Sequence, residues 1–579
     1  MNKKVVSSFF VFSILAVSLA SCSNKGYSNF DDAKLSSELT KIDLPLINHS
    51  SMYNLKDDKI TTYFFKDGHV PYVGINEFID SLDGYFISDD FNFFINNRRK
   101  TGSVDLTIND YKYWFDLDCK KETIKSNDTS MFNHINSPEG INYSGHFKLT
   151  KIEKYIGQHV YFDLKSYEYN LLIKDNDIIV PFDVLNFLLL SPNVSNVAFN
   201  GKEFHFFGNY IQDTKDFASI RNQDVAGKEI PQDLIEARNN GLFFVLDNFY
   251  GLKEYYKISS FKELVSLDTE MYEKLYSSNP KDFSIGLKKL LIDRLDDPHT
   301  SMVFKSIYNE IKSSGKEIIY SSSEYSGKRV TSILNTYNNL IEDVQNKFGE
   351  DYYFKTLDDT DYFRFSEFSV GYDDDIYNED GSIKPDAYKY DTFYLFQKYF
   401  NEIKQNGAIK NVVIDLTCNL GGSIASCINA IGYLTDNLIK VPERDITSNE
   451  RLISSYKVDS DSDGDFNDND SYDTYNYYVL TSNATFSCGN LFTSICKDLG
   501  IAKIIGEQSG GGMCYVQPVL LLDGTYLNIS GPGQMKSAKE VKNGYELYDI
   551  EGGIEIDYKV PSDKFYDFNY INNLIDNID

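Results

Sequence analysis

The sequence is poor in basic residues and in histidine. It contains 57 Lys and Arg against 86 Asp and Glu, which gives a formal net charge of −29 at pH 7. A surface of that sign repels phosphate backbones, so the composition predicts that nucleic acid is not a partner. It also disfavours a basic patch that would bind anionic lipid headgroups. Only seven histidines are present, and six of them lie before residue 206.

Zinc-type cysteine patterns and long apolar runs are missing as well. None of the seven cysteines stands in a Cys-x-x-Cys pair. Beyond the N-terminus, no stretch approaches the roughly 20 apolar residues that a membrane-spanning helix needs. Five cysteines fall within residues 418–514, in apolar or glycine-rich surroundings. Buried free thiols are expected there, with one disulfide as the open alternative.

The first 22 residues carry the pattern of a secretory signal. Lys3 and Lys4 precede an apolar run over residues 5–20, which ends in small side chains. The last four residues, Leu-Ala-Ser-Cys, resemble the bacterial lipobox, in which the cysteine is lipidated. We therefore expect a lipoprotein signal peptide over residues 1–22, a lipid on Cys22, and anchoring to a bacterial cell membrane outside the cytoplasm. An ordinary signal peptide with a chance cysteine is the alternative.

The rest of the chain changes character several times. A weak repeat, residues 69–79 and 179–188, places a Val-Pro-aromatic strand before an amphipathic helix, as in small stalk-type modules of bacterial surface proteins. Leucines at helical spacing follow, and past residue 350 apolar strands alternate with helices, which predicts a layered α/β domain. The expected parts are a tether, two β-rich α+β modules, a helical lead-in and the α/β domain, over residues 23–50, 51–125, 126–215, 230–350 and 351–579.

Two turns of that α/β domain could hold reactive groups. Gly421 and Gly422 follow an apolar strand and precede a helix, where backbone N–H groups can face an anion. Ser487 stands at a second strand-to-helix turn, where its hydroxyl can be exposed and the amide of Cys488 can face a developing oxyanion. Taken alone, the Gly421–Gly422 pattern also fits a tight structural turn. The Ser487 pattern also fits a serine that caps the N-terminus of a helix.

A serine nucleophile needs a base that accepts its proton. The small number of histidines leaves few candidates for that base. His299 is the one histidine beyond residue 205. It follows Asp-Asp-Pro at the end of a helical segment. If the base is an imidazole from the C-terminal half, it is His299. The alternative is a helix-terminal histidine without a chemical role.

Together these segments resemble the C-terminal processing (tail-specific) serine peptidases and their tricorn-core relatives. The resemblance covers about residues 230–579 in the family's order, at residues 296–300, 415–422, 487–490, 505–510 and 551–557. It implies a layered crotonase/Clp-like catalytic domain and a serine endopeptidase that acts on peptides or proteins without a catalytic cofactor. Ser487 would be the nucleophile and His299 the base. The oxyanion donors would be the amides of Gly421 or Gly422 and of Cys488.

The departures from the family pattern bear on the base. Many members pair the serine with a lysine 25 positions later, where this chain has Gly512. The tricorn-like branch instead uses the histidine with a late glutamate, which implies Glu551 as the residue that orients His299, with Asp549 or Glu555 as alternatives. That branch has a serine just before the histidine, where Pro298 stands here. A catalytically inactive peptide-binding lipoprotein with the same fold is therefore the competing interpretation.

An acidic stretch outside these motifs predicts a metal site. Its spacing fits the D-x-D-x-D-G loop of EF-hands, with a carboxylate at the twelfth position and a glycine at the sharp turn. Alternating carboxylates suit a hard cation, so the pattern predicts a structural Ca²⁺ site rather than a catalytic metal. A solvated acidic loop is the alternative. The predicted ligands are Asp459, Asp461, Asp463, Asp465 and Asp470.

Overall fold

The computed structural model describes most of the 579-residue chain. It covers residues 38–578, apart from residues 109, 156, 212–213, 311–318, 321, 350–352, 468–469 and 543. The predicted signal peptide with Cys22, and the tether as far as residue 37, lie outside the described residues. Within the described part, no helix combines the length and the apolar character that crossing a membrane requires.

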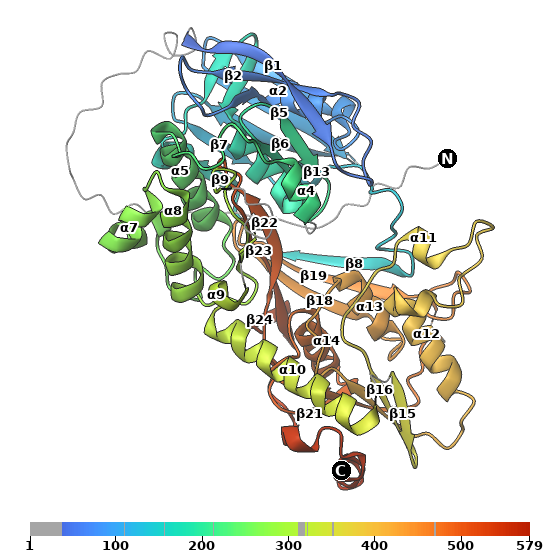
Figure 1. Cartoon of the computed structure of the whole chain (residues 1–579). Helices are drawn as coiled ribbons and strands as arrows, with labels where there is room; N and C mark the ends of the chain where they lie inside the picture. Colours follow the sequence, from blue (N-terminus) through green and yellow to red (C-terminus); the bar gives the residue numbers. More distant parts are fainter. Residues whose placement is uncertain are drawn as a thin grey trace.

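The N-terminal region is built on two sheets (Figure 1). The larger sheet has the strand order β10-β11-β3-β2-β1-β13-β12 and the smaller one β4-β5-β6-β7-β9. The larger sheet contains β1 Thr40–Asn48, β2 Lys59–Phe64, β3 Tyr72–Gly74, β10 Leu172–Lys174, β11 Asp177–Pro181, β12 Asn196–Phe199 and β13 Phe204–Phe207. The smaller sheet contains β4 Phe91–Asn96, β5 Thr101–Ile108, β6 Tyr111–Asp118, β7 Thr123–Ser126 and β9 Val160–Asp163.

Strands from the two expected modules share both sheets, so the structure does not divide at residue 125. The expected repeats explain the mixing. Each repeat is a strand followed by a helix, β3 with α2 (Ile75–Ser81) and β11 with α3 (Phe182–Leu185). The two strands pair antiparallel with each other, Val180 opposite Val73. Because each repeat supplies the sheet neighbour of the other, the sheet is completed by the pair and not by either module alone.

Helices dominate between the N-terminal sheets and the α/β part of the chain, as the leucine spacing predicts. They are α4 Thr214–Ser219, α5 Gln232–Phe249, α6 Phe261–Ser266, α7 Thr269–Leu275, α8 Pro280–Leu287, α9 Ser322–Tyr325 and α10 Lys328–Phe348. Residues 288–294 continue α8 as a π-helix and lead into the His299 segment. The N-terminal caps of two helices are residue types that favour this position. The side chains of Ser260 and Asp268 accept hydrogen bonds from backbone N–H groups at the starts of α6 and α7.

The C-terminal half is a mixed α/β structure with two sheets, which confirms the layered fold. One sheet has the order β15-β16-β17-β20-β21-β25 and is parallel from β16 onward. Its strands are β15 Phe354–Leu357, β16 Thr360–Arg364, β17 Asn411–Asp415, β20 Asn476–Thr481, β21 Ala502–Gly506 and β25 Tyr558–Lys559. The helices of this half are α11 Asp373–Ile376, α12 Thr392–Ile403, α13 Ile424–Gly432, α14 Cys488–Asp498 and α15 Phe568–Ile575.

The second sheet of this half is antiparallel and recruits strands from distant parts of the chain. Its path is β14-β23-β18-β19-β8, and β22 and β24 also pair with β23. The strands are β8 Phe147–Tyr155, β14 Ser301–Phe304, β18 Ile439–Asp445, β19 Arg451–Val458, β22 Cys514–Leu520, β23 Tyr526–Val541 and β24 Gly544–Asp549. β8, which belongs to the N-terminal region by sequence, runs along the edge of this sheet beside β19 (Figure 1).

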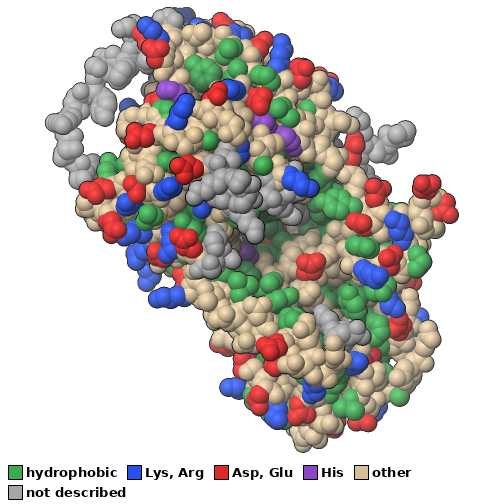
Figure 2. Space-filling view, in the orientation of Figure 1, with side chains coloured by type: hydrophobic (Ala, Val, Ile, Leu, Met, Phe, Trp, Pro, Cys, Tyr) green, Lys and Arg blue, Asp and Glu red, His purple; other side chains and the backbone are tan. Residues whose placement is uncertain are grey.

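The surface and the thiols agree with the composition. On the face shown in Figure 2, Lys and Arg side chains are interspersed with Asp and Glu. The six cysteines of the described chain are all buried and none of them forms a disulfide, as expected of thiols in apolar surroundings. They are Cys119, Cys418, Cys427, Cys488, Cys496 and Cys514.

Candidate active site

Ser487 occupies a strained turn between β20 and α14. It has φ 55° and ψ −118°, values that a non-glycine residue adopts only where the surroundings impose them. The turn is held on both sides, because Ser487 N–H donates to the Gly511 carbonyl at 2.9 Å and Phe486 N–H to the Asn419 carbonyl at 2.9 Å. The serine side chain is only partly buried, whereas its neighbours Phe486 and Cys488 are buried. The backbone therefore presents the hydroxyl outward at the start of a helix.

The glycine turn after β17 lies directly against this serine. β17 and β20 are parallel neighbours, so their carboxyl ends, and the two turns, meet at one edge of the sheet. A Cβ on Gly421 would stand 2.6 Å from the Ser487 Cβ, and one on Gly422 would stand 2.2 Å from the Phe368 carbonyl oxygen. Both glycines also have positive φ, 112° and 130°. The pair of glycines is therefore required by the close approach as well as by the backbone conformation.

The hydrogen bonds around this turn separate the candidate oxyanion donors. Gly421 N–H is engaged, because it donates to the Asn419 side-chain oxygen at 3.0 Å. In the described part of the chain, no hydrogen bond occupies the N–H of Gly422. Cys488 is the first residue of α14, so its N–H has no intrahelical acceptor. The two open amides beside Ser487 are thus those of Gly422 and Cys488.

His299 packs against the residues on either side of the serine turn. Its ring centroid lies 4.7 Å from that of Phe486, the residue before Ser487. A Cβ on Gly512 would stand 3.1 Å from His299 Cε1, and the preceding residue, Gly511, accepts the Ser487 N–H. The structure thus brings the predicted nucleophile and base to one site from sequence positions 188 residues apart. Among the described residues, no hydrogen bond joins the serine hydroxyl to the imidazole.

The surroundings of His299 keep its imidazole uncharged. The side chain is 8% exposed, and Nδ1 is buried without a hydrogen-bond partner among the described residues. Burial lowers the pKa of His299 to about 4; nearby Asp297 opposes the shift, and Arg329 adds to it. At neutral pH the ring can therefore accept a proton.

Glu551 is buried beside this site and is held by other partners. Its two carboxylate oxygens accept hydrogen bonds from Arg329 Nη1 at 2.9 Å and from the Met513 N–H at 3.0 Å. Burial raises the pKa of Glu551, Asp297 raises it further, and Arg329 opposes the shift. The structure places Glu551 among these charged neighbours of His299 without a hydrogen bond between the two.

Asp297 is a buried carboxylate that the motif comparison passed over. Its Oδ1 accepts the His299 N–H at 3.1 Å, and its Oδ2 accepts the hydroxyls of Thr300 at 2.6 Å and Tyr250 at 3.2 Å. An aspartate two residues before a turn residue often binds that residue's N–H, which is the signal that could have identified it. Arg329 had no comparable signal, because its partner Glu551 is 222 residues away.

The two alternative acidic residues lie elsewhere. Asp549 is exposed and forms an ion pair with Lys536, and Glu555 is exposed. A cavity of about 510 Å³ opens beside the Arg329–Glu551 pair. Its lining is mostly polar and consists of Tyr255, Tyr256, Arg294, Leu295, Asp296, Arg329, Asn483, Gln508, Ser509, Gly510 and Gly552.

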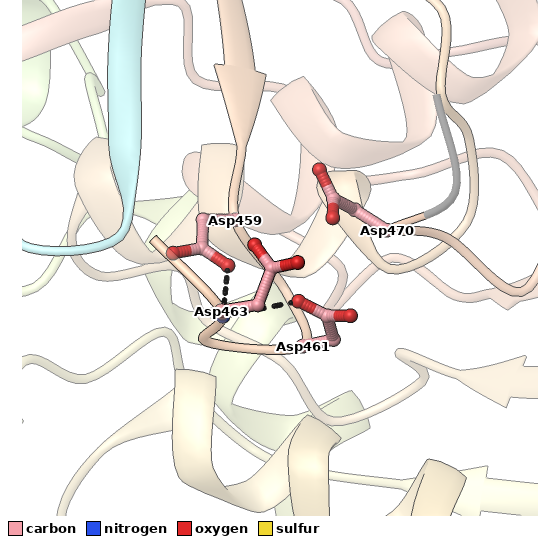
Figure 3. A group of neighbouring side chains, drawn as sticks. All are labelled: Asp459, Asp461, Asp463 and Asp470. Atoms are coloured by element: carbon pink, nitrogen blue, oxygen red, sulfur yellow. Dashed lines mark hydrogen bonds between the residues drawn. The ribbon is translucent and has the colours of Figure 1, made fainter. Parts of the chain in front are cut away.

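The predicted metal ligands lie in the loop between β19 and β20. Four of the five aspartates, Asp459, Asp461, Asp463 and Asp470, offer carboxylate oxygens that all lie within 4.8 Å of one another (Figure 3). Asp465 does not belong to this group. Its N–H donates to Asp463 Oδ1 at 2.8 Å, which ties its backbone to the same turn.

Three solved structures illustrate what the chain resembles. A photosystem II D1 C-terminal processing protease is 21% identical, with 35% of this chain and 42% of that chain covered and a TM-score of 0.24. A putative peptidase from Parabacteroides merdae is 16% identical, with 56% and 89% covered and a TM-score of 0.38. A lipoprotein from Streptococcus agalactiae is 13% identical, with 57% and 92% covered and a TM-score of 0.32. With TM-scores below 0.5, these likenesses carry no argument about activity.

The match to a protein family is more informative. A comparison with curated proteins found no match. Residues 381–560, however, match the family described as Peptidase family S41. That range contains both glycines of the β17 turn, the Ser487 turn and Glu551, whereas His299 precedes it. The motifs within residues 381–560 that resemble tail-specific peptidases are thus supported by an independent comparison, in which this part of the chain matches Peptidase family S41.

Proposed function

We propose that the chain is a serine endopeptidase in which Ser487 is the nucleophile and His299 the general base. The observation that carries the proposal is their shared site: a strained, partly exposed serine, with an uncharged buried imidazole packed on the preceding residue, Phe486, and close to Gly512. A nucleophile, a base and open backbone amides are the parts that acyl transfer requires.

The reaction begins with attack of Ser487 Oγ on a peptide carbonyl. His299 takes the hydroxyl proton during the attack and later gives it to the leaving amine, and water then releases the acyl-enzyme. The imidazole can begin this cycle at neutral pH because its lowered pKa leaves it unprotonated. Reorientation of a side chain on substrate binding must close the hydroxyl–imidazole hydrogen bond, as is common for apo enzymes.

Backbone amides stabilise the oxyanion. The N–H groups of Gly422 and Cys488 have no acceptor in the described structure and stand beside Ser487. The position of Cys488 at the N-terminus of α14 adds the positive end of the helix dipole. Loss of one such donor typically costs about 10²–10³ in rate.

The carboxylates near His299 stabilise the imidazolium that forms. Asp297 is fixed by Tyr250 and Thr300, and Glu551 by Arg329 and the Met513 amide, so neither needs to reorganise. The polar cavity beside Arg329 is the proposed binding place for part of a peptide or protein substrate, because it adjoins Gly510 next to the serine turn.

A fluorophosphonate probe, which labels only activated serines, tests the proposal. The full chain should be labelled, and Ser487→Ala and His299→Ala should each abolish labelling while circular dichroism and the melting temperature stay near those of the wild type. Ser332→Ala is the matched control, because this exposed serine lies on α10 and accepts a hydrogen bond from the cavity residue Asn483. Its labelling should be unchanged. Labelling that survives Ser487→Ala would refute the assignment.

A second candidate function is a non-catalytic peptide-binding protein. The observation that favours it is the unpartnered Nδ1 of His299 together with the missing serine–imidazole hydrogen bond. A folded wild type that is not labelled but binds a peptide library in the Ser487 site would support this function and exclude the peptidase.

We also propose that the protein is a lipoprotein anchored outside the cytoplasm through Cys22. The support is the sequence of residues 1–22, a basic start, an apolar run and a lipobox-like end. Expression in a bacterium fed an alkyne-tagged fatty acid should label the wild type in the membrane fraction. Cys22→Ala should be unlabelled and retain its signal peptide. Equal labelling of both forms would contradict the anchor.

A further inference from the structure

The acidic loop between β19 and β20 contains a carboxylate that its own surroundings do not satisfy. Asp470 is 3% exposed. Its Oδ2 accepts the Asn467 N–H at 3.0 Å, but Oδ1 is buried and has no hydrogen-bond partner among the described residues. A buried carboxylate oxygen without a donor is costly, so a partner of opposite charge is to be expected at this point.

The neighbours of that oxygen are other carboxylates. Asp459, Asp461 and Asp463 come from the turn that follows β19, and Asp470 approaches them from the returning part of the loop (Figure 3). In the described part of the chain, no Lys or Arg forms an ion pair with any of the four. Four negative charges within 4.8 Å repel one another strongly unless a cation lies among them.

The spacing of these residues identifies the cation. Counting from Asp459, the four grouped carboxylates stand at positions 1, 3, 5 and 12, and Gly464 at position 6 has the left-handed φ of 90° that the sharp turn needs. We propose that Asp459, Asp461, Asp463 and Asp470 bind Ca²⁺. In such loops position 7 contributes its backbone carbonyl, which agrees with Asp465 having its side chain outside the group. A flexible set of oxygen ligands suits Ca²⁺ better than Mg²⁺, which demands near-octahedral geometry.

The loop sits where the N-terminal region joins the peptidase domain. Asp459 N–H donates to the carbonyl of His146, the residue before β8. The preceding residue of β19, Val458, lies opposite Phe147 and forms the last residue pair of the β19–β8 ladder. At the other end of the loop, Ser471 N–H donates to Asp436 Oδ1, just beyond α13. The bound ion therefore fixes the end of β19 against the start of β8, and its role is to hold the two parts of the chain together.

Calcium binding is tested on the full chain by titration calorimetry and by thermal unfolding after removal of metal with a chelator. One Ca²⁺ should bind per chain and, at about 100 times its dissociation constant, raise the melting temperature by roughly 2–5 °C. Mg²⁺ at the same concentration should give a clearly smaller shift. Asp461→Asn with Asp463→Asn should lower the affinity by more than about tenfold and remove the shift.

The matched control is Asp465→Asn, which removes one charge from the same loop without removing a proposed ligand. It should keep the affinity within about threefold of the wild type. An unchanged melting curve with and without chelator, a Mg²⁺ shift equal to that of Ca²⁺, or equal losses in Asp465→Asn and the double variant would each overturn the proposal. Hydrogen exchange provides the positional readout, because Ca²⁺ should slow exchange in β8 as well as in the loop. None of these measurements depends on peptidase activity.

Discussion

At the scale of single residues, the site depends on how closely glycines allow its parts to approach. Gly512 has φ 86°, and a Cβ there would stand 2.6 Å from two ring atoms of Phe486 and 3.1 Å from His299 Cε1. Gly512→Ala should therefore displace the imidazole from Ser487. Because a misplacement of about 1 Å can cost about 10²-fold in rate, we expect a loss of that order in kcat/KM.

Gly407→Ala is the control for that substitution. A Cβ on Gly407 meets nothing within 4 Å, its φ is not positive, and it lies outside the cavity. Its activity and melting temperature should stay near those of the wild type. If Gly512→Ala were as active as Gly407→Ala, His299 would not need its observed position, and the assignment of the base would fail.

Burial, with a smaller contribution from the charge of Arg329, determines the pH range expected for the proposed reaction. Only the unprotonated imidazole accepts the serine proton, so activity is present above the pKa of His299 and is lost as the pH falls through it. Burial and Arg329 lower that pKa, so the acid limb of kcat/KM should lie well below pH 6.5. Arg329→Gln removes a positive charge and should move the limb to higher pH, whereas Arg329→Lys should move it less. A limb that stays in place in both variants would show that the charge of Arg329 does not act on the titrating base.

What could be predicted at this scale followed from local motifs. Ser487, His299 and the paired glycines each stand in a short segment whose residue types indicate a role, and the structure brings these segments together. Asp297 and Arg329 were missed because their importance arises from contacts. Arg329 lies outside every motif and reaches Glu551 only through the packing of α10. Which of the two glycine amides is open also depends on a side chain, that of Asn419.

At the scale of elements, α13 packs against β19 so closely that it requires a glycine. A Cβ on Gly432 would stand 2.3–2.8 Å from three side-chain atoms of Val458. Gly432→Ala should overpack this contact and lower the free energy of unfolding by about 1–3 kcal/mol. Gly407→Ala is the control, because a Cβ there meets nothing within 4 Å. Urea unfolding of both variants measures the difference in their free energies of unfolding. Equal midpoints would mean that α13 can move away from β19 without loss of stability.

The elements of the peptidase domain were predictable because their apolar periods are strong. The alternation of strands and helices expected past residue 350 is observed, for example, in β17, α13, β20, α14 and β21. β8 was not predictable as a strand of the antiparallel C-terminal sheet. Its side chains are mostly exposed and include three lysines, so its sequence has no buried face to indicate a partner. The boundary expected at residue 125 does not separate two modules in the structure. It was not predictable for a related reason, because the strand order depends on pairings between distant segments.

At the scale of the whole molecule, the helical lead-in and the C-terminal sheets share one interior. Arg238 on α5 and Asp523 in the β22–β23 turn form an ion pair at 3.2 Å, and both side chains are 0% exposed. The guanidinium also stacks on Phe283, 3.4 Å from its ring centroid. One apolar cluster extends from Leu46 to Ile554 and includes residues of every region. These contacts predict a single cooperative unit rather than independent domains.

A fragment of residues 351–579, the α/β domain as its sequence delimits it, tests this unity. The fragment would lack β8 and β14, two strands of its antiparallel sheet. It would also lack Arg238, the ion-pair partner of Asp523, and loss of one partner of a buried pair costs about 3–5 kcal/mol. We expect the fragment to unfold without a cooperative transition and to bind a hydrophobic dye.

Because the fragment also lacks His299, inactivity alone would not be informative. Full-length His299→Ala is the control, inactive but cooperatively folded. A fragment with a sharp transition near that of this control would show that the α/β domain folds alone and that the preceding regions only supply a base and two strands.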